Sequence, residues 1–187
     1  MPHQPGRHLL LPHPISERGA VQGLVEQLSV DVSRRDEKLV LRYCLVGDLR
    51  ALRLPDPRPA ARTDGLWRHT CFEAFVGYAG GGEYREYNFS PSGAWAAYHF
   101  TAYREGMSPL MKGAPPLLRP HLGEDQLELE ATVDLRGLAD SPARGSLKLG
   151  LSAVVEDRAH GLSYWALKHP VEKPDFHHAD GFVIELA

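Results

Sequence analysis

Cysteine is scarce in this chain of 187 residues, which contains only Cys44 and Cys71. Both lie in expected strands among apolar neighbours, which favours two reduced and buried thiols. A disulfide between them would require an oxidising compartment.

Long apolar runs and blocks of basic residues are also missing. No apolar run approaches the roughly 20 residues that span a bilayer. The apolar stretch at residues 9–11 is too short for the core of a signal peptide. The formal net charge is −3, and lysine and arginine are scattered among acidic residues. We therefore expect a cytoplasmic protein with neither a membrane nor a nucleic acid as its partner.

Motifs for catalysis are absent as well. The chain has no G-x-S-x-G, no H-E-x-x-H, no phosphate-binding glycine loop and no C-x-x-C. Carboxylates such as Glu73 and Glu86 are plentiful, but a chain of this size offers many such pairs, so they do not indicate a glycosidase. The ten histidines lack the spacing of metal ligands. We expect neither an enzyme nor a metal site.

Alternation of apolar and polar residues is the dominant pattern that the sequence does contain. Residues 127–135 read LELEATVDL, and residues 39–45 and 147–155 alternate in the same way. A strand with one apolar and one polar face is typical of an antiparallel sheet. We expect the apolar faces of two of these strands to be buried: Leu127, Leu129, Val133, Leu147, Leu149 and Leu151.

Short strands separated by turns account for most of the remaining chain. The 18 glycines and 15 prolines suit many tight turns. Many strands with almost no helix indicate an all-β sandwich or barrel. We expect a single domain over residues 1–187, in which residues 1–15 form an irregular or edge-strand lead-in. The other expected strands cover residues 24–32, 71–76, 84–89, 95–101, 162–167 and 182–186.

Tryptophan is the most informative residue type for a binding site. Trp67 and Trp165 lie in distant segments, each bordered by polar residues, LWRHT and SYWALKH. A buried indole needs a partner for its N–H group. The three tryptophans can therefore be core residues, or a pair of them can be a stacking platform for a ring-shaped ligand.

The run DGLWRHTCFEAFVG at residues 64–77 resembles the signature of the DOMON-like superfamily, which includes the type 9 carbohydrate-binding modules. Its matching features are Trp67, Glu73 six positions later in a strand, and the apolar alternation that follows. Residues 83–97 resemble the following hairpin of that family, and residues 180–186 its closing strand. The resemblance implies an immunoglobulin-like or jelly-roll β-sandwich of about ten mostly antiparallel strands.

The same resemblance implies two classes of ligand. Sugar-binding members hold a sugar ring between tryptophans, so Trp67 corresponds to one wall, Glu73 to a hydroxyl acceptor and Trp165 to a second wall. Haem-binding members use a methionine with a histidine or lysine, whereas a scaffold domain would hold no small ligand. The haem candidates are Met107 or Met111 together with Lys168, His169 or His178.

We expect a non-catalytic domain that binds a carbohydrate or similar small polar ligand without a cofactor; haem b binding and an intracellular scaffold role are the alternatives. Trp67, Glu73 and Trp165 should then line one pocket, with residues 103–116 or 169–178 at its rim. A regular strand would hold Trp67 and Glu73 about 20 Å apart, so the chain must bend near residues 68–70. The Glu73 carboxylate also needs a partner if it is buried. The candidates for that partner are Arg68, Arg85 and Tyr87, and Arg85 is also a candidate ligand-binding residue.

Overall fold

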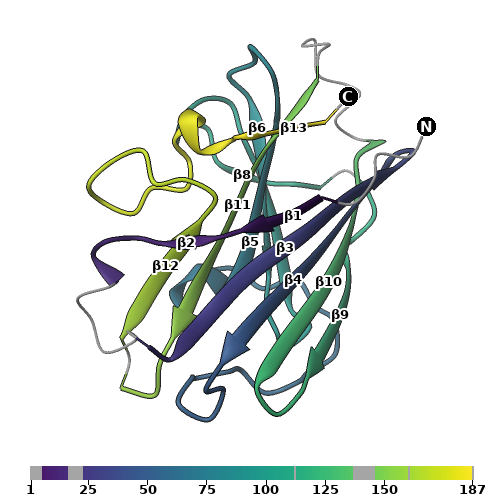
Figure 1. Cartoon of the computed structure of the whole chain (residues 1–187). Coiled ribbons are helices and arrows are strands. Elements are labelled where there is room, and N and C mark those ends of the chain that lie inside the picture. The colour runs from purple at the N-terminus through teal and green to yellow at the C-terminus, as the bar shows by residue number, and fades with distance from the viewer. Residues whose placement is uncertain (1–5, 17–22, 112, 137–145, 160, 187) are drawn as a thin grey trace.

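Two β-sheets packed face to face form the computed structural model, which describes residues 6–16, 23–111, 113–136, 146–159 and 161–186 (Figure 1). The named strands all pair in antiparallel fashion. The first sheet has the strand order β1 (Gly6–Leu9), β3 (Val25–Arg35), β4 (Lys38–Gly47), β10 (Gln126–Asp134) and β9 (Leu117–Leu122). This arrangement confirms the expected all-β sandwich.

The second sheet carries the remaining strands. Its order is β2 (Leu11–Pro12), β12 (Leu162–Ala166), β11 (Leu147–Glu156), β5 (Cys71–Tyr78), β6 (Tyr84–Phe89), β7 (Trp95–Phe100) and β8 (Ser108–Pro109), and β13 (Ile184–Leu186) also pairs with β11. Two single turns of 3-10 helix, η2 (Leu66–Arg68) and η4 (Ala179–Gly181), lie between strands. No helix in the described part of the chain combines the length and apolar character needed to cross a membrane.

The main core lies between the two sheets and is built from the apolar faces of alternating strands. All six leucine and valine side chains that the alternation predicts to be inside, on β10 and β11, are buried. Tyr43 crosses this core: its ring stacks on Phe72 at 4.9 Å, and its hydroxyl donates a 2.7 Å hydrogen bond to the Glu73 carbonyl oxygen. The core therefore ties β4 of one sheet to β5 of the other.

The lead-in segment joins the edges of the two sheets. Strand β1 pairs with β3, and strand β2, after one intervening residue, pairs with β12. The described part of the expected lead-in, residues 6–15, therefore includes edge strands.

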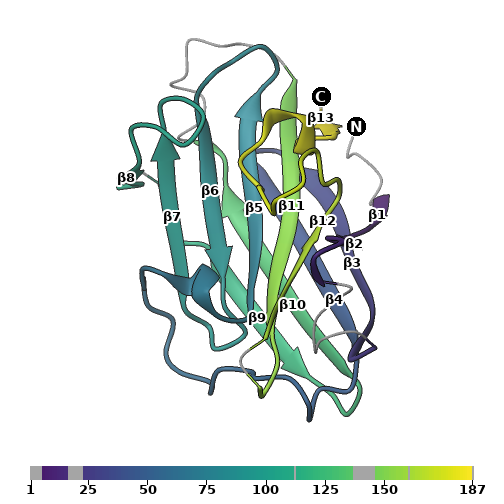
Figure 2. The ribbon, with the colours of Figure 1, turned by 90° about the vertical axis from the view of Figure 1, so that its left-hand side faces the viewer.

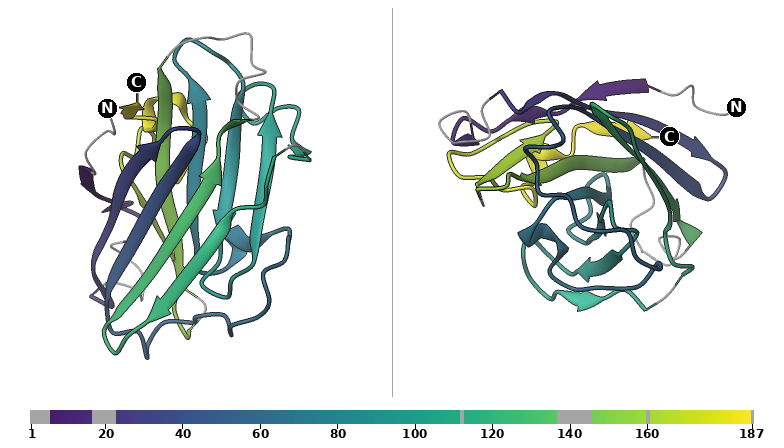
Figure 3. Two further views of the ribbon diagram at one scale, coloured as in Figure 1. Left: turned by 90° about the vertical axis from the view of Figure 1, so that its right-hand side faces the viewer. Right: turned by 90° about the horizontal axis from the view of Figure 1, so that it is seen from below.

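The outer face of the first sheet carries a ladder of alternating charges. The left panel of Figure 3 shows the strands of this sheet from the side that carries the ladder. The ladder consists of one residue from each strand, all directly opposite their neighbours in register: Arg7, Asp31, Arg42, Glu130 and Arg119. Arg7 contacts Asp31 at 3.0 Å, while Glu130 contacts Arg42 at 2.7 Å and Arg119 at 3.3 Å. Such charges favour a face that is exposed to water.

The outer face of the second sheet is covered in part by other segments of the chain. Figure 2 shows η2 in front of this sheet at β6 and β7, and the C-terminal segment in front of β5 and β11. Phe182 of that segment packs against Phe75 of β5 with ring centroids 5.9 Å apart. A second, mainly aromatic cluster thus lies on this outer face, separate from the main core.

Candidate functional site

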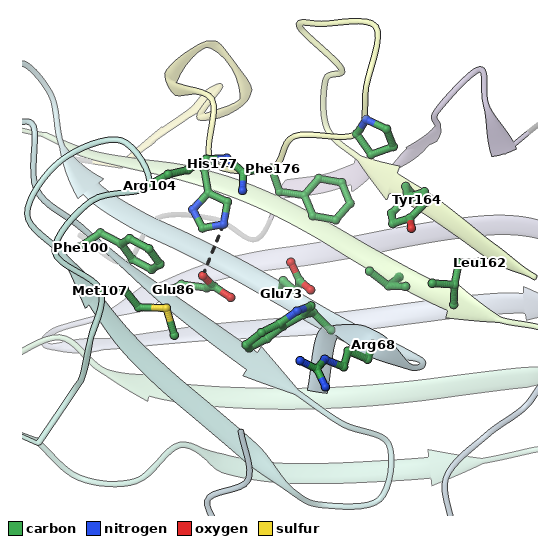
Figure 4. Close-up of a pocket in the computed structure, with 13 residues that line it drawn as sticks. Arg68, Glu73, Glu86, Phe100, Arg104, Met107, Leu162, Tyr164, Phe176 and His177 are labelled. Atoms are coloured by element: carbon green, nitrogen blue, oxygen red, sulfur yellow. Dashed lines mark ion pairs between the residues drawn. The ribbon is translucent and has the colours of Figure 1, made fainter. Parts of the chain in front are cut away.

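A pocket of about 540 Å³ opens on the outer face of the second sheet (Figure 4). This volume lies within the range of small-molecule sites. Its floor comes from β5, β6 and β11. Its walls come from η2, β12, the end of β7 with the segment that follows it, and the segment before η4. The lining residues are Trp67, Arg68, Glu73, Glu86, Phe100, Arg104, Met107, Val154, Leu162, Tyr164, Pro174, Phe176 and His177.

Strand alternation places two carboxyl groups on the pocket floor. On β5, Phe72 and Ala74 join the main core, so Glu73 between them points to the outer face. Glu86 of β6 points to the same face, because its partner in the register is Phe75, two residues from Glu73 on β5. Glu73 and Glu86 are therefore diagonal neighbours on one sheet face.

The turn before β5 holds Trp67 at the pocket wall. Gly65 adopts a left-handed backbone conformation, with φ of 77°, immediately before η2. Leu66 is buried beneath this turn, whereas Trp67 remains 36% exposed. The Trp67 ring meets Tyr98 edge to face at 5.9 Å, and the Tyr98 hydroxyl donates a 2.7 Å hydrogen bond to Asp64. The indole thus rests on an anchored tyrosine and exposes part of its surface to the pocket.

The chain bends where the sequence predicts, between Trp67 and the start of β5. The 3-10 turn ends at Arg68, and the strand begins at Cys71. Thr70 fixes the bend, since its hydroxyl donates to the Arg53 carbonyl oxygen at 3.0 Å and accepts from the Glu156 amide at 3.1 Å. Trp67 and Glu73 consequently line the same pocket.

Burial dominates the electrostatics of the two floor carboxyl groups. Glu73 is 2% exposed and Glu86 is 5% exposed. Desolvation raises the pKa of both, and the charge of Glu86 raises the pKa of Glu73 further. The Ser152 hydroxyl, 3.4 Å from Glu73 Oε2, and the Asn88 amide, 2.7 Å from Glu86 Oε1, oppose these shifts. Glu73 Oε1 is buried and has no hydrogen-bond partner among the described residues.

His177 closes one side of the pocket in its neutral form. Burial and the nearby Arg104 guanidinium lower its pKa to about 4. Its Nδ1 lies 2.8 Å from the Tyr84 hydroxyl, and its Nε2 lies 3.7 Å from Glu86 Oε2. Because the Tyr84 oxygen accepts from the Arg104 amide, the tyrosine proton is available to Nδ1, and we place the histidine proton on Nε2, facing Glu86.

Asp175 holds the segment that carries His177 to the segment after β7. Its carboxylate accepts hydrogen bonds from the Tyr103 hydroxyl, from the Arg104 guanidinium at 2.7 Å and from the His177 amide at 3.1 Å. These contacts join two walls of the pocket that are more than 70 residues apart in the chain. The hydrogen bonds of Asp175 therefore hold this side of the pocket together.

Trp165 does not lie where the sequence analysis places it. It is 8% exposed within the main core, and its Nε1 donates a 2.9 Å hydrogen bond to the Ser163 hydroxyl. Its neighbours Leu162 and Tyr164 line the pocket instead. Because side chains alternate along β12, Tyr164 and Trp165 point to opposite faces of the sheet, so the expected second tryptophan wall is wrong.

Arg85 is likewise not among the residues that line this pocket. It lies between Tyr84 and Glu86 on β6 and is buried, on the same strand face as Tyr87, which belongs to the main core. Of the three partners expected for the Glu73 carboxylate, only Arg68 lines the pocket, and Glu73 instead has Ser152 as its hydrogen-bond donor.

The candidate haem ligands do not line one common pocket. Met107 lines the pocket, whereas Met111 is 85% exposed. Lys168 and His178 line a second pocket, of about 880 Å³, which lies beyond His177. The His169 ring lies 2.8 Å from the Leu11 carbonyl oxygen. No group of three or more His, Cys, Asp or Glu side chains that could hold a metal ion occurs within the described residues.

The sequence analysis missed Tyr164 and the pairing of Glu86 with Glu73. Phe176 and His177 lie in the segment 169–178 that was expected at the rim, although neither residue was singled out. Alternation along residues 84–89 could have placed Glu86 and Tyr84 on one face. However, the register that brings Glu86 beside Glu73 depends on the turn between β5 and β6. Phe176 and His177 come from a segment without regular structure, in which no periodic pattern indicates direction.

Comparisons with known proteins bear on the fold. No family model matches the chain, and no curated protein matches its sequence. A solved structure from Bacteroides uniformis, of a protein with a proposed carbohydrate-binding role, is similar with a TM-score of 0.61 and 15% identity over 83% of this chain and 76% of that chain. Two structures of a family 9 carbohydrate-binding module from Caldicellulosiruptor kristjanssonii also match.

The first of those two, in complex with cellotriose, has a TM-score of 0.46 and 10% identity over 75% of this chain; the second, in complex with glucose, has a TM-score of 0.44 and 11% identity over 74%. This chain covers 65% of each of those two chains. The match to the Bacteroides uniformis structure confirms the kind of fold that the sequence resemblance predicts, whereas membership of the DOMON-like superfamily stays a prediction. The chain thus has a β-sandwich fold similar to that of the Bacteroides uniformis protein.

Proposed function

We propose that this protein is a non-catalytic domain that binds a carbohydrate, or a similar small polar ligand, in the pocket on the outer face of the second sheet. The observation that carries the proposal is the pairing of a half-exposed indole, Trp67, with buried carboxyl groups, Glu73 and Glu86, around one cavity. An indole face matches the C–H face of a sugar ring, and carboxyl oxygens accept hydrogen bonds from hydroxyl groups.

The remaining walls support a ring-shaped ligand. Phe100, Tyr164 and Phe176 add aromatic surface, and Met107 adds a flexible apolar side chain. Rigid aromatic walls with a few fixed polar groups are typical of small-molecule sites. In this arrangement Trp67 and the aromatic residues supply stacking surface, whereas the floor groups and His177 orient the ligand.

The similar fold of the Bacteroides uniformis protein adds support, since a carbohydrate-binding role is proposed for that protein too. The pocket geometry carries more weight, because it belongs to this chain. We place no catalytic step in the pocket.

Intrinsic fluorescence titrated with monosaccharides and disaccharides tests the proposal. Stacking contributes roughly 1–3 kcal/mol per ring, so Trp67→Ala should weaken binding by about 5- to 150-fold. Trp165→Phe is the matched control, because Trp165 lies in the core and the variant should keep both the binding and the response. A native protein that responds to none of the sugars at millimolar concentration would overturn the proposal.

A further inference from the structure

The pocket floor holds two buried acids that have no hydrogen bond from a lysine or arginine within the described residues. Neither Glu73 nor Glu86 accepts a hydrogen bond from a lysine or arginine among the described residues; their donors are Ser152 and Asn88. Glu73 Oε1 has no partner at all within the described structure, although Glu73 is only 2% exposed. A buried polar atom left without a partner is costly, and because Glu73 lines the pocket this atom can accept a hydrogen bond from a bound ligand.

The charged groups around these two acids do not neutralise them. His177 is neutral near pH 7 and lies 3.7 Å from Glu86. Arg104 lowers the pKa of Glu86 but is itself bound to Asp175 at 2.7 Å. Arg68 belongs to η2 and is exposed, so water screens its charge. The floor of the pocket therefore favours a positive group.

The walls suit the same kind of group. Trp67, Phe100, Tyr164 and Phe176 line the cavity above the floor. Aromatic faces attract cations, and most strongly when water is excluded. Two acids below and aromatic rings around them form a complementary environment for an ammonium group.

We infer that the pocket selects a ligand that carries an ammonium group, and that the sugar it binds is an amino sugar. This inference rests on the proposed function, because it names the class of sugar for the same site. The ammonium group would lie between Glu73 and Glu86 and donate to both, including Glu73 Oε1. A neutral sugar brings no positive charge, so it does not favour the ionised form of the two acids.

Binding of the ammonium group should release a proton. In the free protein the two neighbouring carboxyl groups hold a proton between them, because two negative charges at this buried site repel. When the ammonium cation enters, both carboxyl groups ionise and the proton leaves to the buffer. One positive charge replaces another, so the charge of the site is conserved.

Isothermal titration calorimetry with glucosamine, glucose and N-acetylglucosamine tests this inference. At about pH 6.5 a simple amine is protonated. We expect glucosamine to bind at least about tenfold more tightly than the two neutral sugars, because a hydrogen bond between charged groups contributes this much affinity. Titrations in two buffers of different ionisation enthalpy should show close to one proton released for glucosamine and none for glucose.

Glu73→Gln and Glu86→Gln should each remove most of the preference for glucosamine and abolish the proton release. Both variants replace an acid by a neutral side chain of the same shape, and thermal denaturation checks that they fold. Glu105→Gln is the matched control, since Glu105 is exposed and does not line the pocket. This control should keep the preference.

The outcomes separate the inference from the proposed function. If glucose and glucosamine bind equally well, or if glucosamine binds without proton release, the inference is wrong and the sugar-binding proposal stands. If none of the three sugars binds and the wider sugar panel is also negative, both are wrong. A preference that survives both glutamine substitutions also overturns the inference.

Discussion

Replacing Glu73 by glutamine should change how the stability of the protein depends on pH. Burial and the neighbouring Glu86 raise the pKa of Glu73 well above 4.5 in the folded state. In the unfolded chain both groups return to ordinary values near 4.5. Between the unfolded and folded pKa values the native state binds more protons than the unfolded state, so stability falls as the pH rises.

The magnitude follows from the number of protons retained. Each extra proton held by the folded state makes the free energy of unfolding fall by about 1.4 kcal/mol per pH unit. The stabilising contribution is fully present below about pH 4.5 and is lost as the pH rises through the folded pKa values. Glu73→Gln has no proton to lose at position 73, so its slope should be shallower by up to this amount.

Urea denaturation at several pH values between 4.5 and 7.5 measures the two slopes. The absolute stability of the variant also depends on the new amide group, because the position of Glu73 Oε1 offers it no hydrogen-bond partner among the described residues. The difference in slope is therefore the informative quantity. Glu105→Gln, at an exposed position, should follow the native curve. Parallel curves for the native protein and Glu73→Gln would refute the reasoning, because they would show that Glu73 ionises normally.

Three further substitutions have distinct expected outcomes. Trp165→Ala should lower the free energy of unfolding by about 3–5 kcal/mol in chemical denaturation, because it opens a cavity in the core. Asp175→Asn should weaken sugar binding and speed amide hydrogen exchange at residues 103–104 and 175–177, because it weakens the hydrogen bonds that join these two segments. The loss of global stability should be small. Arg42→Ala should cost no more than about 1 kcal/mol, and less in high salt, because its partner Glu130 lies at the surface; a loss of several kcal/mol would contradict this view of the ladder.

Much of the fold could be predicted from the alternation of apolar and polar residues alone. Strand β6 has the predicted bounds of residues 84–89, and the predicted apolar faces of β10 and β11 are buried. Strand β9, residues Leu117–Leu122, was missed, because it lies at a sheet edge and is mostly exposed, so its burial does not alternate. An edge strand has one neighbour and need not carry a continuous apolar face.

Only part of the site could be predicted from the sequence, for a related reason. Trp67 and Glu73 share a pocket because the chain bends at polar residues, and the sequence showed that bend. The choice between Tyr164 and Trp165 depends on which face of β12 meets the core, and both faces carry an aromatic residue. Alternation divides the side chains of a strand between two faces, but it does not show which face meets the core when both faces are apolar. The pairing of Glu73 with Glu86 depends on register, which arises only when the strands assemble.

The charge ladder on the first sheet also affects what can happen at the ends of that sheet. The ladder begins with Arg7 on β1 and finishes with Arg119 on β9, the two edge strands. If a second molecule extended the sheet edge to edge with its own ladder in line, guanidinium groups would meet side by side, and like charges directly opposite each other are destabilising. Pro120, next to Arg119, has no amide proton to offer to an added strand. An alternating series with an odd number of charges thus has the same sign at both ends, and this opposes the polymerisation to which open sheets are prone.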